Sequence, residues 1–123
     1  MFKVDIELSK HCARLICSGR LVHGQESELL KSIVETRKEP VVAIDLANVH
    51  DADAAGLGML AFLQHRLQLR NRELVLVAPS THLRGLLRIT GLDTVLAIRP
   101  SDTFLSREAT VTGDAAVPYK SAF

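Results

Sequence analysis

The chain has 123 residues, the size of one ordinary domain, and 47% of them are hydrophobic, which is enough to fill a core. The 15 Lys and Arg residues and the 14 Asp and Glu residues give a formal net charge of +1. Proteins that bind DNA or RNA usually carry a basic excess, so this balance argues against a nucleic-acid partner. No apolar run approaches the roughly 20 residues of a membrane helix, and no signal peptide is recognisable, so we expect a cytoplasmic protein without a membrane span.

The two cysteines, Cys12 and Cys17, lie five residues apart in one predicted strand. An odd separation places them on opposite faces of a sheet, where a disulfide between them has poor geometry. No His or Cys stands at zinc-ligand spacing around them. We therefore expect two small, buried or half-buried side chains in a reducing compartment, and no metal or other cofactor.

The first half of the chain predicts a hairpin, a helix and a buried strand. Alternating apolar and polar residues over 4–9 and an apolar stretch over 13–18 predict two antiparallel strands, the second ended by Gly19. Apolar residues then recur at helical spacing over 25–37. The nearly continuous apolar run Val41–Leu46 is typical of a strand that is covered on both faces.

The second half continues the alternation of strand and helix. A polar loop is predicted over 47–53, followed by a helix over 54–70 with a leucine stripe. A buried strand over 73–78 leads to a short helix over 81–89, which Ser80 or Thr81 is expected to cap and Gly91 to end. The last predicted strand covers 95–98.

This order of elements predicts an α/β fold, because strand–helix–strand units are right-handed crossovers that build parallel sheets. We expect one domain over residues 1–108, with a mostly parallel, mixed sheet of about five strands flanked by about four helices and an antiparallel N-terminal strand. Its exposed edge strand leaves the oligomeric state open. A few helical residues are expected after Ser101. Residues 109–123 predict a mobile tail, with docking of Val117–Tyr119 on a partner as the alternative.

Catalytic signatures are absent from the sequence, which has no Gly-x-Ser-x-Gly elbow and no recognisable Cys/His/Asn grouping. The richest polar cluster is His50, Asp51 and Asp53. One short loop does not supply the convergent groups of an active site, so we interpret these residues as solvated loop charges and a helix cap. The protein is predicted not to be an enzyme, a metal or general-base site being the alternative. The five histidines are expected to be exposed for the most part.

The segment AAGLG, Ala54–Gly58, opens a helix directly after a strand and loop. Such a helix start presents free N–H groups that could hold an anion. The glycine spacing fits neither the P-loop nor the dinucleotide fingerprint. We therefore interpret Gly56 and Gly58 as positions where the helix lies close against a strand or loop, with nucleotide binding as the alternative.

Five separated stretches of the sequence together carry a family resemblance: SGRL (Ser18–Leu21), AIDL (Ala43–Leu46), DADAAGLG (Asp51–Gly58), ELVLV (Glu73–Val77) and the segment Leu83–Ile98. In this order they resemble the STAS domain family, the anti-sigma factor antagonists and their relatives, over residues 4–106. DADAAGLG corresponds to the hallmark loop usually written Asp-Ser-Ser-Gly-Leu-Gly. SGRL is similar to the glycine turn after the second strand, although Val22 stands where the family often has an Asp.

The resemblance implies a non-enzymatic protein-interaction domain. Well-known members work by partner switching: the unmodified domain binds an anti-sigma factor that is also a serine kinase of the histidine-kinase-like ATPase type. Phosphorylation of the Ser after the hallmark Asp breaks that complex, because it adds nearly two negative charges to the contact face. Here Ala54 occupies the phosphoserine position and Ala55 the next one, and no Ser or Thr lies between Thr36 and Ser80.

We therefore expect an anti-sigma factor antagonist or scaffold that holds its partner without control by phosphate. The alternatives are a degenerate relative that serves as a regulatory subunit of a transporter or signalling complex, and a nucleotide-binding regulatory domain that uses Arg84 or Arg88. Asp53 is expected to cap the helix after it. The resemblance places the partner-contacting residues at Val22, His23, His50, Asp51, Asp53, Ala54, Ala55, Gly56 and Leu57.

Overall fold

The computed structural model describes residues 2–100. The elements are β1 (Lys3–Leu8), β2 (Cys12–Leu21), α1 (Gln25–Thr36), β3 (Val41–Ala52), α2 (Ala54–Gln68), β4 (Glu73–Val77), α3 (Thr81–Ile89), the short 3-10 helix η1 (Leu92–Thr94) and β5 (Ala97–Arg99). The expected helical turn after Ser101, the domain boundary at residue 108 and the tail of residues 109–123 lie outside the described residues.

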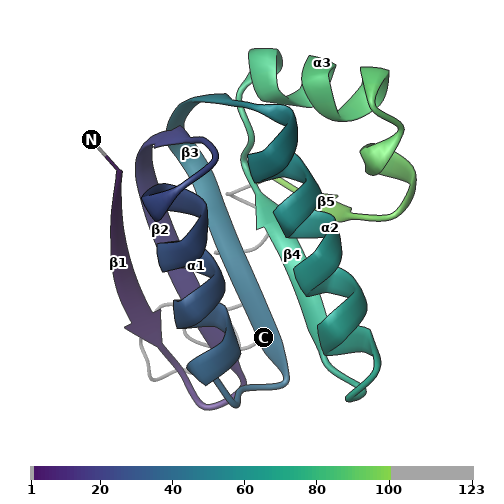
Figure 1. The fold of residues 1–123 in the computed structure, drawn as a ribbon. Helices are drawn as coiled ribbons and strands as arrows, with labels where there is room; N and C mark the ends of the chain where they lie inside the picture. The colour runs from purple at the N-terminus through teal and green to yellow at the C-terminus, as the bar shows by residue number, and fades with distance from the viewer. Residues whose placement is uncertain (1, 101–123) are drawn as a thin grey trace.

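The five strands form one sheet in the order β1-β2-β3-β4-β5, with β1 antiparallel to β2 and every other pair parallel (Figure 1). The predicted mixed α/β sheet with an antiparallel N-terminal strand is therefore confirmed. Helices α1 and α2 lie on one face of the sheet, and α3 lies across the end of the sheet where α2 begins. Among residues 2–100, no helix has both the length and the apolar character that crossing a membrane requires.

The main core lies between the sheet and the two long helices. Inward side chains of the strands alternate along each strand, as Val42, Ile44 and Leu46 do on β3, and all three are buried. Helix α2 adds four buried leucines, at positions 57, 60, 63 and 67. Burial of this kind stabilises the fold by roughly 1.5–3 kcal/mol per large side chain.

The two cysteines confirm the prediction of opposite faces. Cys17 belongs to the main core, whereas Cys12 belongs to a second, smaller cluster on the other face of the sheet. Burial raises the pKa of the Cys17 thiol to about 12, and the negative charge of Asp45 adds to the shift.

The structure corrects two predicted strand ends. Gly19 does not end β2, which continues to Leu21, and the predicted loop over 47–53 is strand as far as Ala52. The two strands pair with each other beyond the end of β4, with register shifts near Ser18 and Gly19. This pairing gives hydrogen-bond partners to backbone N–H and C=O groups that would bond to water in a loop. Exposed and polar residues such as Asn48 are therefore tolerated in the strand.

A smaller correction concerns β5. The predicted strand over 95–98 lies at Ala97–Arg99, because η1 and the turn after it take up the preceding residues. Gly91 has φ 77°, a left-handed conformation that a glycine adopts without strain, and it ends α3 as predicted. The cap by Ser80 is also confirmed, since its hydroxyl accepts the Leu83 N–H at 3.1 Å.

Candidate functional site: the start of helix α2

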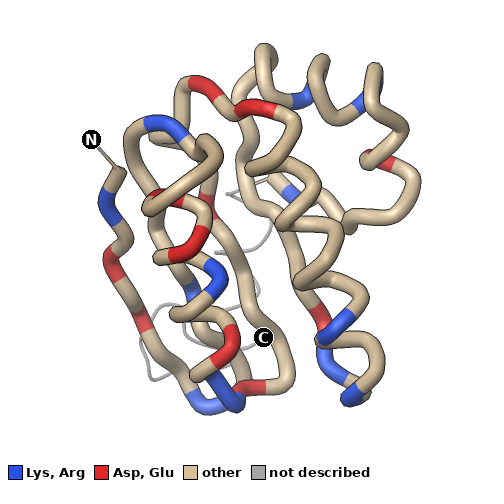
Figure 2. Tube along the Cα trace, in the orientation of Figure 1, with Lys and Arg blue, Asp and Glu red and all other residues tan. Residues whose placement is uncertain are grey.

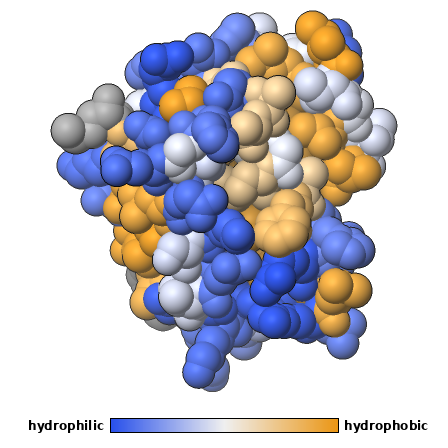
Figure 3. Space-filling model, viewed as in Figure 1, coloured by the Kyte–Doolittle hydropathy of each residue, from blue (hydrophilic) through white to orange (hydrophobic). Residues whose placement is uncertain are grey.

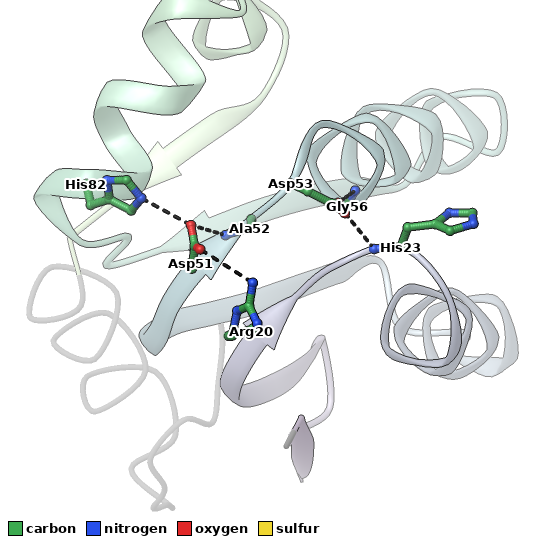
Figure 4. A network of polar contacts seen from close by, with 7 residues as sticks. All are labelled: Arg20, His23, Asp51, Ala52, Asp53, Gly56 and His82. Atoms are coloured by element: carbon green, nitrogen blue, oxygen red, sulfur yellow. Dashed lines mark hydrogen bonds and ion pairs between the residues drawn. The ribbon is translucent and has the colours of Figure 1, made fainter.

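The extended β2–β3 pair delivers two chain segments to the same corner of the molecule, the β2–α1 turn and the start of α2. The carboxylate of Asp53 joins them (Figure 4). Its Oδ1 accepts the Gly56 N–H at 2.8 Å, and its Oδ2 accepts the His23 N–H at 3.0 Å. Asp53 therefore caps α2 as predicted, and it also fixes the neighbouring turn.

The two N–H groups also set the ionisation of Asp53. The hydrogen bond from His23 and then that from Gly56 hold the pKa of this carboxyl below its ordinary value. The side chain is therefore ionised at neutral pH, so both bonds to it are charge-assisted. The negative charge also lies at the positive end of the α2 dipole, which favours it further.

Gly56 brings α2 close to the end of β2. A Cβ added to Gly56 would lie 2.3 Å from the Leu21 carbonyl oxygen, a distance that no side chain tolerates. The predicted close approach is thus confirmed at Gly56. It is wrong at Gly58, where an added Cβ would meet no atom within 4 Å.

A second set of polar contacts lies behind the loop, and it joins three elements. Asp51 Oδ1 lies 3.1 Å from His82 Nε2 at the start of α3, and Asp51 Oδ2 lies 3.8 Å from Arg20 Nη2 on β2 (Figure 4). The hydrogen bond with His82, and then the one from the Ala52 N–H, hold the pKa of Asp51 below its ordinary value. These three side chains are partly exposed to solvent, so they orient the end of β3 relative to α3 and add little to the core.

The predicted contact residues divide into an outer and a buried group. His23, His50, Asp53, Ala54 and Ala55 are exposed, and Val22 and Asp51 are half-buried. Gly56 and Leu57 are buried, so they shape the corner from beneath. We call the exposed segments at Val22–His23 and Asp53–Ala55 the α2 corner.

The outer surface of α2 beyond this corner carries no formal charge over its first turns. No Asp, Glu, Lys or Arg lies between Asp53 and Arg66, and Figure 2 shows the tube of α2 without either charge colour over this stretch. Figure 3 shows pale and apolar residues over the same part of α2, bordered by hydrophilic ones over α1. Phe62 lies at the far border of this surface, 44% exposed, with Lys31 and Arg66 against its ring. The arrangement fits contact with a macromolecule better than chemistry on a small molecule.

The remaining candidate residues lie outside the α2 corner. Among residues 2–100, no three His, Cys, Asp or Glu side chains are grouped so as to hold a metal ion. His50 is exposed on β3, and Arg84 and Arg88 are exposed on α3. Sequence reasoning missed the contact of His82 with Asp51, because 31 residues separate the two and no local pattern links them.

The sequence matches a family model described as "Mlab, STAS domain" over residues 4–100. The chain belongs to the STAS domain family. Comparison with curated proteins gives no match for this STAS domain.

Solved structures show the same fold at low sequence identity. The Bacillus cell fate determinant SpoIIAA in its phosphorylated form is 15% identical, with a TM-score of 0.67, over 85% of this STAS domain and 98% of that chain. The unphosphorylated form of SpoIIAA, an anti-sigma factor antagonist, is 14% identical, with a TM-score of 0.62, over 80% and 86%. An anti-sigma factor antagonist from Mycobacterium paratuberculosis is 20% identical, with a TM-score of 0.69, over 80% and 86%.

Proposed function

We propose that this STAS domain is a non-enzymatic interaction module that binds a protein partner through the α2 corner, and that no phosphate at the start of α2 controls the binding. The proposal rests on the exposure of Ala54 and Ala55 at the start of α2. The hydrogen bonds of Asp53 and the close packing of Gly56 against Leu21 hold this segment in place. A surface that is exposed and held in one conformation loses little entropy on binding.

The partner class follows from the fold relatives. SpoIIAA has been solved with and without phosphate and is described as an anti-sigma factor antagonist. We therefore propose an anti-sigma factor, of the serine-kinase type with a histidine-kinase-like ATPase fold, as the partner. A regulatory role in a transporter or signalling complex would use the same α2 corner, and the identity of the bound partner separates the two.

Alanine at both hydroxyl positions determines how such a complex is regulated. A phosphate requires a hydroxyl, and methyl groups stand at positions 54 and 55. The partner therefore meets the same methyl groups at positions 54 and 55 at all times. Release would then depend on the partner's own state or concentration.

The geometry gives less support to nucleotide binding. The Gly56 N–H, which a phosphate would need, is already bonded to the Asp53 carboxylate. Asp51 adds a second negative charge nearby, and the polar partners of Asp51 and Asp53 among the described residues do not include Arg84 or Arg88. Two carboxylates at the helix start repel a polyphosphate.

The substitution Ala54→Glu tests the proposal, because it places a negative charge where a phosphoserine would stand in relatives. We expect the fold to be unaffected or stabilised by about 0.3–1 kcal/mol, since an acidic residue at a helix N-terminus is favourable. We expect capture of the partner from the native lysate to fall at least tenfold, which corresponds to about 1.4 kcal/mol. Quantitative mass spectrometry of the retained proteins measures this fall.

Gln68→Glu is the matched control, because it adds the same charge to an exposed position at the far end of α2. It should leave capture unchanged. Equal retention of every protein by the wild type, Ala54→Glu and Gln68→Glu would show that the α2 corner is not the contact surface.

A further inference from the structure

Strand β1 forms an edge of the sheet, because within residues 2–100 it pairs with β2 and with no other strand. At the turn that joins the two strands, the Ser9 N–H donates to the Cys12 carbonyl oxygen at 2.9 Å. Hydrogen-bonded and non-hydrogen-bonded pairs alternate along an antiparallel ladder. Val4, Ile6 and Leu8 therefore direct their N–H and C=O groups away from β2, to the outer edge, where a further strand can pair with them.

This edge has few of the features that keep an edge strand from pairing. Proline, a bulge or inward-pointing charges commonly protect such strands. β1 contains no proline, and it pairs with β2 without a register shift. On the side of the sheet that carries the helices, Val4 packs against the main core, whereas Ile6 is 45% and Leu8 54% exposed. Figure 3 shows apolar residues at the side of the molecule where Figure 1 draws β1.

The apolar surface continues from β1 onto α1. A hollow of about 330 Å³ lies there, lined by Phe2, Gln25, Glu26 and Leu29. Phe2 is buried beneath it as part of the main core, and Leu29 on α1 is 43% exposed. The open backbone edge and an exposed apolar strip thus lie side by side, which is what a strand added to this edge would cover.

The sequence of β1 fits a second copy of itself. Two copies can pair about a two-fold axis perpendicular to the sheet, and residues that lie opposite each other then share a face. In the register that places Asp5 on the axis, Lys3 of each copy lies opposite Glu7 of the other. Opposite charges at directly facing positions stabilise such a pair. In the same register Val4 and Ile6 exchange backbone hydrogen bonds across the axis.

This register also uses the hollow, and its neighbours fit less well. It places Leu8 of one copy opposite Phe2 of the other, beside the hollow between β1 and α1. A register centred on Ile6 would set Asp5 against Glu7 twice, which like charges disfavour. A register centred on Val4 would leave Leu8 beyond the end of the partner strand. The register centred on Asp5 has one unfavourable contact, that of Asp5 with its own copy.

We infer that β1 pairs with β1 of a second copy, antiparallel and with Asp5 on the two-fold axis, so that the two sheets form one continuous sheet. The inference does not depend on the proposed function, because it uses none of the residues of the α2 corner. An extended segment of another protein is the rival occupant of this edge.

Exchange of charge across the axis tests the inference. Sedimentation velocity of the full-length chain, from about 1 μM to about 1 mM, should show a monomer that becomes a dimer as the concentration rises. Lys3→Glu and Glu7→Lys should each weaken the dimer at least tenfold, because each sets like charges opposite each other at both ends of the pair. An equimolar mixture of the two variants should form a heterodimer at least tenfold tighter than either homodimer, since every Glu then faces a Lys. Arg88→Glu makes the same change of charge on α3 and should leave the dissociation constant unchanged.

Asp5→Asn provides a second test with the opposite sign. It removes the like charges that meet at the axis and should tighten the dimer at least twofold. It also keeps the shape of an exposed side chain, so the fold is unaffected. If Glu7→Lys unfolds, because it sets a cation beside Arg14, the opposite effects of Lys3→Glu and Asp5→Asn decide instead. Circular dichroism reports whether each variant is folded.

Three outcomes would overturn the inference. The wild type could remain a monomer over the whole range, which would leave the edge to a segment of another protein. A dimer could form with the same dissociation constant in the wild type, Lys3→Glu and Asp5→Asn, which would place the contact on another surface. The mixture of folded Lys3→Glu and Glu7→Lys could also fail to restore the dimer, which would exclude the register centred on Asp5.

Discussion

Replacing Gly56 by alanine should destabilise the domain by about 3 kcal/mol or more, although the substitution adds one methyl group to a helix. The added Cβ would lie 2.3 Å from the Leu21 carbonyl oxygen and 3.0 Å from its carbon. Both are backbone atoms of the paired end of β2, so they cannot turn away as a flexible side chain would. The start of α2 must then move outward, which stretches the hydrogen bonds of Asp53. Chemical denaturation with urea measures the loss.

Gly58 offers a control in the same helix, two residues further on. An alanine there would meet nothing within 4 Å. The substitution therefore acts mainly by reducing the conformational entropy of the unfolded chain. Gly58→Ala should therefore stabilise the domain by about 0.5–1 kcal/mol. Similar free energies of unfolding for the two variants would contradict the close approach of α2 to β2.

The second large effect is expected for Asp45→Asn, which should cost about 3–5 kcal/mol. Asp45 accepts hydrogen bonds from the Arg14 guanidinium and from the Ala47 N–H, and its side chain is only 6% exposed. The amide keeps the shape of the side chain but removes its charge. The buried Arg14 cation is then left with Glu7, 3.8 Å away and 56% exposed, as its remaining acidic neighbour in the described part of the chain.

An exposed ion pair provides the matched comparison. Glu35 lies 3.0 Å from Arg66, with side-chain exposures of 32% and 42%. Glu35→Gln makes the same chemical change there and should cost about 1 kcal/mol or less. A loss for Asp45→Asn no larger than that for Glu35→Gln would mean that water reaches the Arg14–Asp45 pair. Urea denaturation of both variants at pH 7 makes the comparison.

Much of the fold could be predicted from local patterns. The run Val41–Leu46 has apolar residues on both faces of the strand, which predicts a strand covered on both faces. Ala43 and Ile44 are buried on opposite sides of the sheet, in agreement with this. The extension of β3 to Ala52 could not be predicted, because its exposed residues Ala47 and Asn48 resemble a loop. Only pairing with β2, 30 residues earlier, makes that segment a strand.

The site was predictable where one residue acts on its own neighbours. The cap by Asp53 follows from an acidic residue directly before a helix. Gly56 and Gly58 look alike in the sequence, and only the packing of β2 gives them different roles. The contacts of Asp53 with His23 and of Asp51 with His82 span 30 and 31 residues, so no local pattern encodes them.

The central claim is that the α2 corner is the surface on which a protein partner rests. Hydrogen–deuterium exchange of this STAS domain, measured alone and with the captured partner, tests it most directly. The account predicts slower exchange in the complex for the amides of Val22, His23, Ala54 and Ala55, and unchanged exchange at the far end of α2 around Gln68 and Leu69. Unchanged exchange at the α2 corner, with protection confined to other surfaces, would contradict it.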